Sequence, residues 1–258
     1  MPPDVPALQP DMTVLFVNDL GGWYRIEGER CIGEFDVTEE MLAPDGSVRP
    51  SILATHGDMV AGVLANKASA PRIPLTVDLT IHRIEPIGAG PVGMVGRLLK
   101  VGHRTAVAEV FFVARGGERP LVVSHATFMP SPKPGDAGPF VGNRDAGRAS
   151  LTRPFAEQLG IRVLAPGIAE IDRVLYTMQP TGTIQGGAVA AVAEVAAETA
   201  AGSAVADLDV RFLSAVRVGP ARATAQVLGA GRVRVEVRDV GNADRLATIV
   251  LATVVPPA

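Results

Sequence analysis

Apolar residues occupy nearly every helical face of the segment GGAVAAVAEVAAETAA, which covers positions 186–201. A helix of this kind has no side suited to solvent, so other elements are expected to enclose it. Its many alanines favour the helix and keep it thin. The β-branched and alternating runs that follow, ending in LATIVLATVV, predict the strands of a long antiparallel sheet. The pattern therefore predicts an α+β fold in which a curved sheet wraps one central helix.

The chain contains this pattern twice. Residues 31–58 align with residues 167–194 at a shift of 136, and six of the 28 aligned positions are identical. The alignment places Asp58 on Glu194, so both halves carry an acid at the same point of their predicted helix. Because the order of turn, helix and strands also matches, we interpret the chain as a tandem repeat.

The second aligned block shows where the halves differ in length. Residues 77–91 match residues 206–220 at a shift of 129 rather than 136. The difference, 136 − 129 = 7, indicates seven extra residues in the first half, near Lys67 to Pro74. The first half is therefore predicted to have a longer connection between its helix and the next strand.

A segment rich in proline and glycine separates the halves. Residues 130–150, PSPKPGDAGPFVGNRDAGRAS, have the composition of a linker. We therefore predict an N-terminal domain over residues 1–129 and a C-terminal domain over residues 151–258.

Composition and charge exclude several functional classes. Hydrophobic residues make up 47% of the chain, charged residues 20%, and the net charge is −3, which is typical of a globular protein and gives no basic patch for nucleic acid. Cys31 is the single cysteine and no Cys/His cluster is present, so no metal site is expected. The N-terminus does not resemble a signal peptide, and glutamates interrupt the apolar stretch at 186–201, so a cytoplasmic protein without a membrane span is expected.

Glu194 is an anomaly within the apolar helix. An ionised carboxylate removed from water costs several kcal/mol unless it is paired or lies at a polar cleft. Gly187 precedes it by seven residues, close to two helical turns, so the carboxylate and the start of the helix share one face. Gly186 and Gly187 have no side chains to block a ligand, and the first N–H groups of a helix are free to donate to an oxyanion. Glu194 and Gly187 are therefore predicted to form one site.

The segment TGTIQGGAVAAVAE at 181–194 resembles a pattern of hotdog thioesterases: a Gly, then Gln or His followed by Gly-Gly, then an acid nine residues after the Gln or His. Gln185 and Glu194 have that spacing. The strands that follow in the first half are also similar, including Gly102 and His103 at a bend. Over most of both halves the chain resembles tandem acyl-CoA thioesterases of the PaaI-like or TesB-like kind.

This resemblance implies a double hotdog, in which two curved antiparallel sheets each wrap a central helix and pack as a pseudo-dimer. It implies hydrolysis of an acyl-CoA thioester without a cofactor. Glu194 would be the general base or the nucleophile, the Gly187 amide would polarise the thioester carbonyl, and Gln185 would orient water or substrate. A homodimer of the double-hotdog chain is a further expectation.

The first half departs from the family pattern. Where the second half has Gln-Gly-Gly, it has Arg49, Pro50 and Ser51, and Pro50 has no N–H to donate. Asp58 still stands in the acid's position, so we rank it as a catalytic candidate below Glu194. The candidate substrate contacts are Gly186, Arg49, Ser51, Thr55, Glu198 and His103. Basic candidates for the phosphates of CoA, each also interpretable as a solvated surface charge, are Arg97, Lys100, His103, Arg104, Arg217, Arg222, Arg232 and Arg234.

Two other functions remain open. A hydratase or dehydratase of acyl-CoA would need a histidine paired with an acid or an asparagine, and no Asp-x-x-x-x-His arrangement is found. A non-catalytic acyl-CoA-binding module is favoured if the degenerate first half and the glutamine at position 185 reflect lost activity. The sequence does not determine the acyl group.

Overall fold

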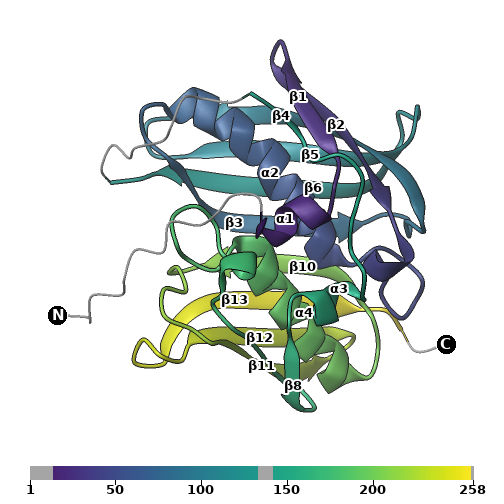
Figure 1. The fold of residues 1–258 in the computed structure, drawn as a ribbon, viewed down its shortest axis with the longest axis vertical. Coiled ribbons are helices and arrows are strands. Elements are labelled where there is room, and N and C mark those ends of the chain that lie inside the picture. Colours follow the sequence, from purple (N-terminus) through teal and green to yellow (C-terminus); the bar gives the residue numbers. More distant parts are fainter. Residues whose placement is uncertain (1–13, 133–141, 257–258) are drawn as a thin grey trace.

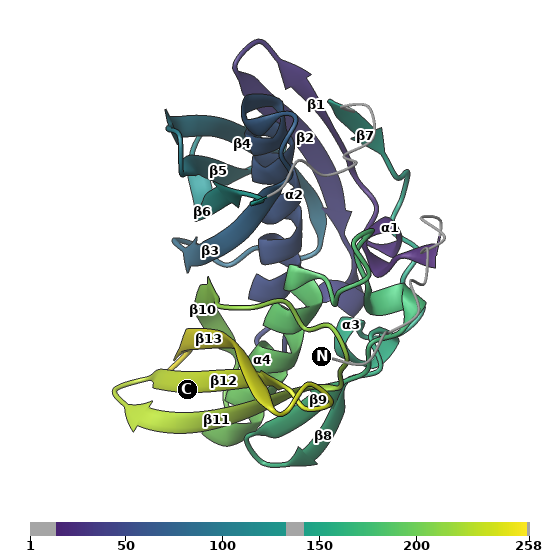
Figure 2. The same ribbon diagram turned by 90° about the vertical axis from the view of Figure 1, so that its left-hand side faces the viewer.

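The computed structural model describes residues 14–132 and 142–256, and within them thirteen strands form one sheet (Figures 1 and 2). The strand order is β7-β1-β2-β4-β5-β6-β3-β10-β13-β12-β11-β9-β8, and each neighbouring pair is antiparallel. The strands are β1 Trp23–Glu27, β2 Arg30–Val37, β3 Pro74–Arg83, β4 Gly90–Val101, β5 Ala106–Ala114, β6 Pro120–Pro130, β7 Asn143–Asp145, β8 Arg162–Ala165, β9 Ile168–Ile171, β10 Val205–Phe212, β11 Ala221–Gly229, β12 Arg232–Asp239 and β13 Arg245–Val254. The α-helices are α1 Phe16–Asp19, α2 Pro50–Ser69, α3 Phe155–Gln158 and α4 Gly186–Ala201, with short 3₁₀ turns at Glu39–Met41 and Leu175–Thr177.

Each half of the chain packs its own strands against its own long helix. Strands β2 to β6 contact α2, and strands β9 to β13 contact α4, with the strands curving round the helices (Figure 2). The prediction that the alanine-rich helix is enclosed is confirmed, because eleven of the sixteen residues of α4 are buried. The α+β fold with a curved sheet around a helix is therefore confirmed for both halves.

The two halves share a single sheet, where the sequence predicted two. Strand β3 of the first half pairs with β10 of the second, and Leu79 lies opposite Val210 at the centre of that junction. Without this contact, β3 and β10 would be unpaired edge strands of their half-sheets. Their pairing satisfies the backbone N–H and C=O groups of both edges.

The two long helices differ in length, which was not predicted. Helix α2 has 20 residues and α4 has 16, and a connection over residues 70–73 leads from α2 into β3. Helix α4 instead ends at Gly202 in the left-handed conformation, and β10 begins at Val205. The extra residues of the first half thus extend its helix and lengthen the connection that follows.

Part of the predicted linker belongs to the sheet. Residues 133–141 lie outside the described residues, but Asn143–Asp145 form β7, which pairs with β1 at the edge of the first half. Arg144 fixes this strand by donating from Nη2 to the carbonyl of Val17 at 2.8 Å and to Oδ1 of Asn18 at 2.7 Å. The division into domains at residues 129 and 151 stays a prediction.

Within the described residues, no helix is long and apolar enough to cross a membrane.

Candidate functional site

Helices α2 and α4 lie antiparallel against each other, so the start of each faces the middle of the other. The amide of Ser51, in the first turn of α2, donates to Oε2 of Glu194 on α4 at 2.9 Å. Conversely, Gly187 in the first turn of α4 lies so close to Thr55 on α2 that an added Cβ would fall 1.9 Å from its Oγ1. An acid on one helix is therefore placed beside the start of the other helix and not beside the start of its own.

This arrangement bears on the predicted site of Glu194 and Gly187. Seven residues separate them along one helix, which is about 10 Å along its axis, and the Glu194 carboxylate binds across to Ser51 instead. The donors that the structure gives the Glu194 carboxylate are Arg49 and the amide of Ser51 at the start of α2. The crossing instead places Asp58 of α2 near the start of α4.

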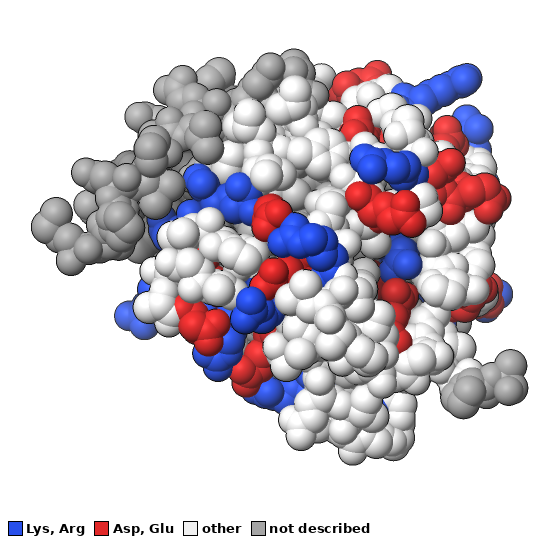
Figure 3. Space-filling view, turned by 60° about the horizontal axis from the view of Figure 1, so that its bottom comes forward, with Lys and Arg blue, Asp and Glu red and all other residues white. Residues whose placement is uncertain are grey.

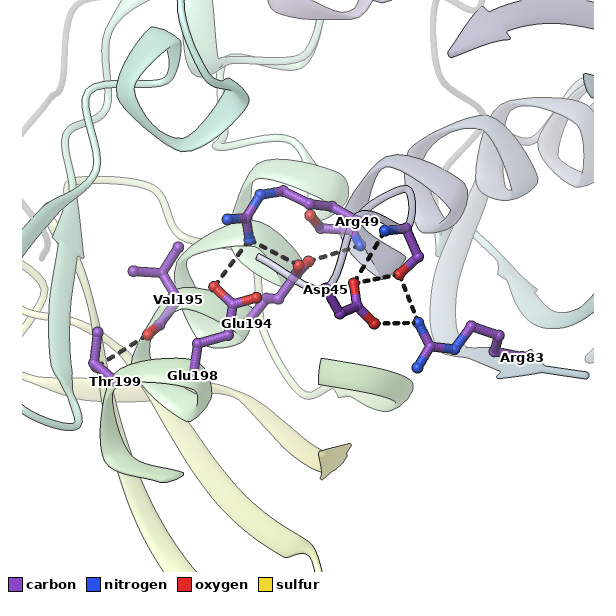
Figure 4. Close-up of polar contacts among 9 residues, drawn as sticks. Asp45, Arg49, Arg83, Glu194, Val195, Glu198 and Thr199 are labelled. Carbon is purple, nitrogen blue, oxygen red and sulfur yellow. Dashed lines mark hydrogen bonds and ion pairs between the residues drawn. The ribbon is translucent and has the colours of Figure 1, made fainter. Parts of the chain in front are cut away.

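Glu194 belongs to a buried ionic cluster with Arg49 and Glu198 (Figure 4). Arg49 Nη1 lies 2.9 Å from Oε1 of Glu194 and 3.0 Å from Oε2 of Glu198. The Glu194 side chain has no exposed surface, and the other two are 11% exposed. Burial lowers the pKa of Arg49, but the two carboxylates raise it by more. Burial and the charge of Glu194 raise the pKa of Glu198, against the lowering effect of Arg49.

The turn before α2 is fixed by a second, smaller network (Figure 4). Asp45 accepts hydrogen bonds from the amide of Ser47 at 3.1 Å and from its hydroxyl at 2.6 Å. Arg83, at the end of β3, donates to the other oxygen of Asp45 at 2.8 Å. These contacts lower the pKa of Asp45 against the raising effect of its burial. They set the position from which Arg49 reaches the two glutamates.

The start of α4 is capped by its own N-cap residue. Gln185 Oε1 accepts hydrogen bonds from the amides of Gly187 and Ala188, and the Gln185 carbonyl accepts one from Val189. Because both side-chain partners are N–H donors, the accepting atom must be the amide oxygen. Of the first four N–H groups, which a helix leaves without internal partners, only that of Gly186 has no acceptor in the described part of the chain.

A cavity of about 460 Å³ lies beside this free amide. Gly186 lines it from α4, Asp58 lines it from α2, and an added Cβ on Gly186 would lie 3.2 Å from the Phe212 ring. Residues 73–77 at the start of β3 form another wall, and the loops at 179–184 and 213–217 complete it. Most of the wall is apolar, and its larger apolar members are Ile73, Leu75, Val77, Ile184, Val189, Phe212, Leu213 and Val216.

Asp58 is the acidic residue that lines this cavity. Its Oδ1 accepts a hydrogen bond of 2.8 Å from the hydroxyl of Thr76 on β3. Burial raises the pKa of Asp58 to about 6, although the Thr76 hydrogen bond lowers it. The carboxylate is therefore mainly ionised at pH 7 and remains a much stronger base than an exposed aspartate.

The other predicted site residues fall in three places. Arg49, Ser51 and Glu198 surround Glu194, Thr55 contacts Gly187, and His103 lines a separate cleft at the end of α2. Among the basic candidates for phosphate, three are engaged in ion pairs: Arg97 with Glu109 and Arg222 with Glu170 across neighbouring strands, and Arg234 with Glu236 along β12. Arg232 donates to the hydroxyl of Thr253, and Arg217 lines the 460 Å³ cavity.

Two cavity residues were missed by sequence reasoning, Thr76 and Phe212. Neither belongs to a motif, and both reach the cavity only because β3 and β10 meet at the junction of the halves. The predicted residues that lie here are Asp58, Gly186 and Arg217. Among the described residues, no group of three or more His, Cys, Asp or Glu side chains is placed to hold a metal ion.

Two other residues that attract attention in the sequence have structural surroundings. The ring of His56 stacks on the ring of Phe35, with 3.9 Å between their centroids. Burial and the nearby charge of Arg144 lower the pKa of His56 to about 3, so the imidazole is neutral and packs in the core. Burial raises the pKa of Cys31 to about 12, which leaves its thiol protonated and unreactive.

No protein-family model and no curated protein sequence matches the chain. Solved structures do match. The 12:0-ACP thioesterase from Umbellularia californica has a TM-score of 0.64 and 12% identity, over 90% of this chain and 99% of that one. An acyl-ACP thioesterase from Bacteroides thetaiotaomicron has a TM-score of 0.59 and 9% identity, over 87% and 97%. A proposed thioesterase II from Thermobifida fusca has a TM-score of 0.57 and 17% identity, over 93% and 98%.

At these identities the likeness is one of fold, and it extends over both halves of the chain and nearly the whole of each matched structure. The resemblance to thioesterases that the sequence predicted is confirmed at that level. The chain therefore has the fold of the hotdog-type thioesterases.

Proposed function

We propose that the protein hydrolyses an acyl thioester in the cavity between its two halves, which form a double-hotdog pseudo-dimer. The observation that supports this proposal is that Asp58 and Gly186 line one cavity. Burial raises the pKa of the Asp58 carboxyl, and the Gly186 amide has no acceptor among the described residues. A base and an oxyanion donor facing a common space are the two groups that acyl transfer to water requires. The base comes from the first half and the donor from the second.

The proposed reaction uses these groups in turn. Asp58 takes a proton from a water molecule, whose oxygen attacks the carbonyl carbon of the thioester. The carbonyl electron pair moves onto oxygen, where the Gly186 N–H and the positive end of the α4 dipole stabilise it. Collapse of this intermediate breaks the C–S bond, and the thiolate takes the proton from Asp58 to give an acid and a thiol. As the nucleophile, Asp58 would instead form a mixed anhydride that water then opens.

In this proposal each chain has one working site. The equivalent site beside the start of α2 is closed, because Glu194 itself accepts the Ser51 N–H and Pro50 offers none. Arg49 fills the space on the other side of the carboxylate. Glu194, first ranked as the catalytic acid, is thus proposed to stabilise the contact between the helices, and Gly187 to permit their close approach.

Acyl-CoA is the substrate class that we propose. The solved structures of the same fold include two acyl-ACP thioesterases by name, so the carrier of the acyl group needs a direct comparison. The apolar wall of the cavity suits an alkyl or aryl acyl group. A homodimer of the chain also stays a proposal.

A non-catalytic acyl-CoA-binding module is the second candidate. The observation that favours it is that the Gln185 side chain already occupies the Gly187 and Ala188 amides, which leaves a single donor for an oxyanion. Such a module would bind acyl-CoA without releasing its thiol.

A proline at position 186 tests the oxyanion donor. Gly186→Pro removes the free N–H, and proline is tolerated at the first position of a helix when the preceding residue is extended, as Gln185 is with φ −68° and ψ 143°. We expect thiol release from acyl-CoA to fall by ~10²–10³ in kcat. Gly186→Ala is the matched control, because it places a Cβ against the same Phe212 ring but keeps the N–H. Equal activity of the two variants would exclude the Gly186 amide as the donor.

A further inference from the structure

A second cleft, of about 530 Å³, lies at the C-terminal end of α2. The last turn of the helix lines it with Ala68 and Ser69, the connection to β3 contributes Arg72, and the hairpin between β4 and β5 contributes residues 101–103. Two cationic or titratable side chains, Arg72 and His103, face this space.

The surroundings of the cleft carry positive charge without counter-charge. Lys67, Lys100 and Arg104 are exposed near Arg72 and His103 in the chain, and none of the five forms an ion pair within residues 14–132 and 142–256. On the face in Figure 3, by contrast, Lys and Arg side chains lie next to Asp and Glu side chains. The negative end of the α2 dipole accounts for Lys67 but not for the residues of the connection and the hairpin.

The seven extra residues of the first half build this cleft. The longer α2 and its connection, residues 66–73, supply Ala68, Ser69 and Arg72. In the second half α4 stops at Gly202, and the equivalent hairpin reads Leu-Gly-Ala-Gly at 228–231, without a charge. The basic cleft thus occurs on the helix that carries Asp58 and is missing from the helix that carries Glu194.

The cleft lies about half the length of α2 from the proposed reaction centre. Asp58 and Ser69 are eleven residues apart on α2, which is about 16 Å along the axis at ~1.5 Å per residue. Arg72 is followed directly by Ile73, one of the residues that line the 460 Å³ cavity. A ligand running along the start of β3 can therefore reach both spaces.

We propose that this basic cleft binds the phosphate at the end of the pantetheine arm of the thioester substrate, an inference that rests on the proposed function. A pantetheine thiol ester places its reacting carbonyl at one end of a long thin arm and a phosphate at the other. Arginine recognises phosphate through two parallel N–H bonds, and a histidine ring N–H adds a third donor. The shared chemistry is the phosphate, whether the arm belongs to coenzyme A or to a carrier protein.

The test is an Arg72→Gln/His103→Gln double variant assayed with three thioesters of one acyl group: acyl-CoA, the acyl-N-acetylcysteamine that lacks a phosphate, and the acyl-carrier protein. We expect KM to rise at least tenfold for the phosphate-bearing thioesters, with kcat unchanged and no effect on the truncated one. A rise with the carrier protein but not with CoA, or the reverse, identifies the source of the phosphate. Equal effects on all three, or on none, would overturn the proposal.

Two controls complete the experiment. Arg119→Gln removes an exposed arginine that pairs with Glu85, between β5 and β6 and away from the cleft, and should change nothing. Arg217→Gln removes the arginine that lines the 460 Å³ cavity, and a KM effect there in place of Arg72 and His103 would also overturn the proposal.

Calorimetry with free coenzyme A gives a readout that does not depend on turnover. We expect the double variant to bind at least tenfold more weakly than the wild type, and equal affinity would contradict the phosphate site. If the wild type releases no thiol yet loses coenzyme A binding in the double variant, hydrolysis fails while the phosphate site stands.

Discussion

The starts of the two long helices occupy equivalent positions in the repeat and have opposite properties. At α4, residues 185–187 leave the N–H of Gly186 free at the wall of a cavity that Asp58 shares. At α2, residues 49–51 leave no such donor, because proline removes the first N–H and Glu194 takes the next. One helix start thus lies at a cavity, while the other is part of the core.

The two acids differ for the same reason. Asp58 has one hydroxyl partner and a cavity beside it, so burial raises its pKa to about 6. Glu194 is longer by one methylene, reaches the opposing helix, and gains a guanidinium and a backbone donor. A buried carboxylate with such partners contributes to the contact between the halves, whereas a poorly partnered carboxylate beside a cavity is the kind that functions as a base.

Removing Arg49 is the change with the largest expected effect on stability. Arg49→Ala leaves Glu194 and Glu198 buried without a positive partner, which should cost about 3–5 kcal/mol in the free energy of unfolding. Denaturant unfolding at pH 7 measures it. Arg97→Ala, which removes a pair whose arginine is 55% exposed, should cost less than about 1 kcal/mol. Similar losses in the two variants would contradict a structural role for the cluster.

Replacing Asp58 should have a smaller and opposite effect. The native state raises its pKa from 3.8 to about 6, so the folded protein binds the proton more tightly than the unfolded chain, and stability falls as pH rises from about 4 to 6. Asp58→Asn removes this loss. With an allowance for its partial exposure, the variant should be about 1–2 kcal/mol more stable than wild type at pH 8 and equally stable near pH 3.5. A gain that does not depend on pH would contradict the raised pKa.

The sequence predicted the parts of the molecule that depend on local pattern. The enclosed helix at 186–201 and the extra residues near Lys67 follow from periodicity and self-alignment, and the structure has both. The alignment also identified Asp58 as the counterpart of Glu194. Partners across the two halves could not be predicted this way, because a helical face shows what shares that face and not what the opposing helix brings to it.

The site depends on such partners. Glu194 and Gly187 share a helix and were predicted to converge, whereas the antiparallel packing brings Ser51 to one and Thr55 to the other. Thr76 and Phe212 line the cavity because β3 pairs with β10, and no residue pattern predicts that pairing. The joining of two predicted sheets into one is the same kind of long-range event.

The most direct test of Asp58 as the base compares two isosteric substitutions, Asp58→Asn and Glu194→Gln. The measurement is thiol release from a panel of short, long and aromatic acyl-CoAs. Both variants are first checked for folding by circular dichroism at the assay temperature. If Asp58 is the base, Asp58→Asn lowers kcat by ~10²-fold or more, while folded Glu194→Gln retains most of the wild-type kcat. Loss of turnover in Glu194→Gln with full activity in Asp58→Asn would contradict this role of Asp58 and return the reaction to the helix of the second half.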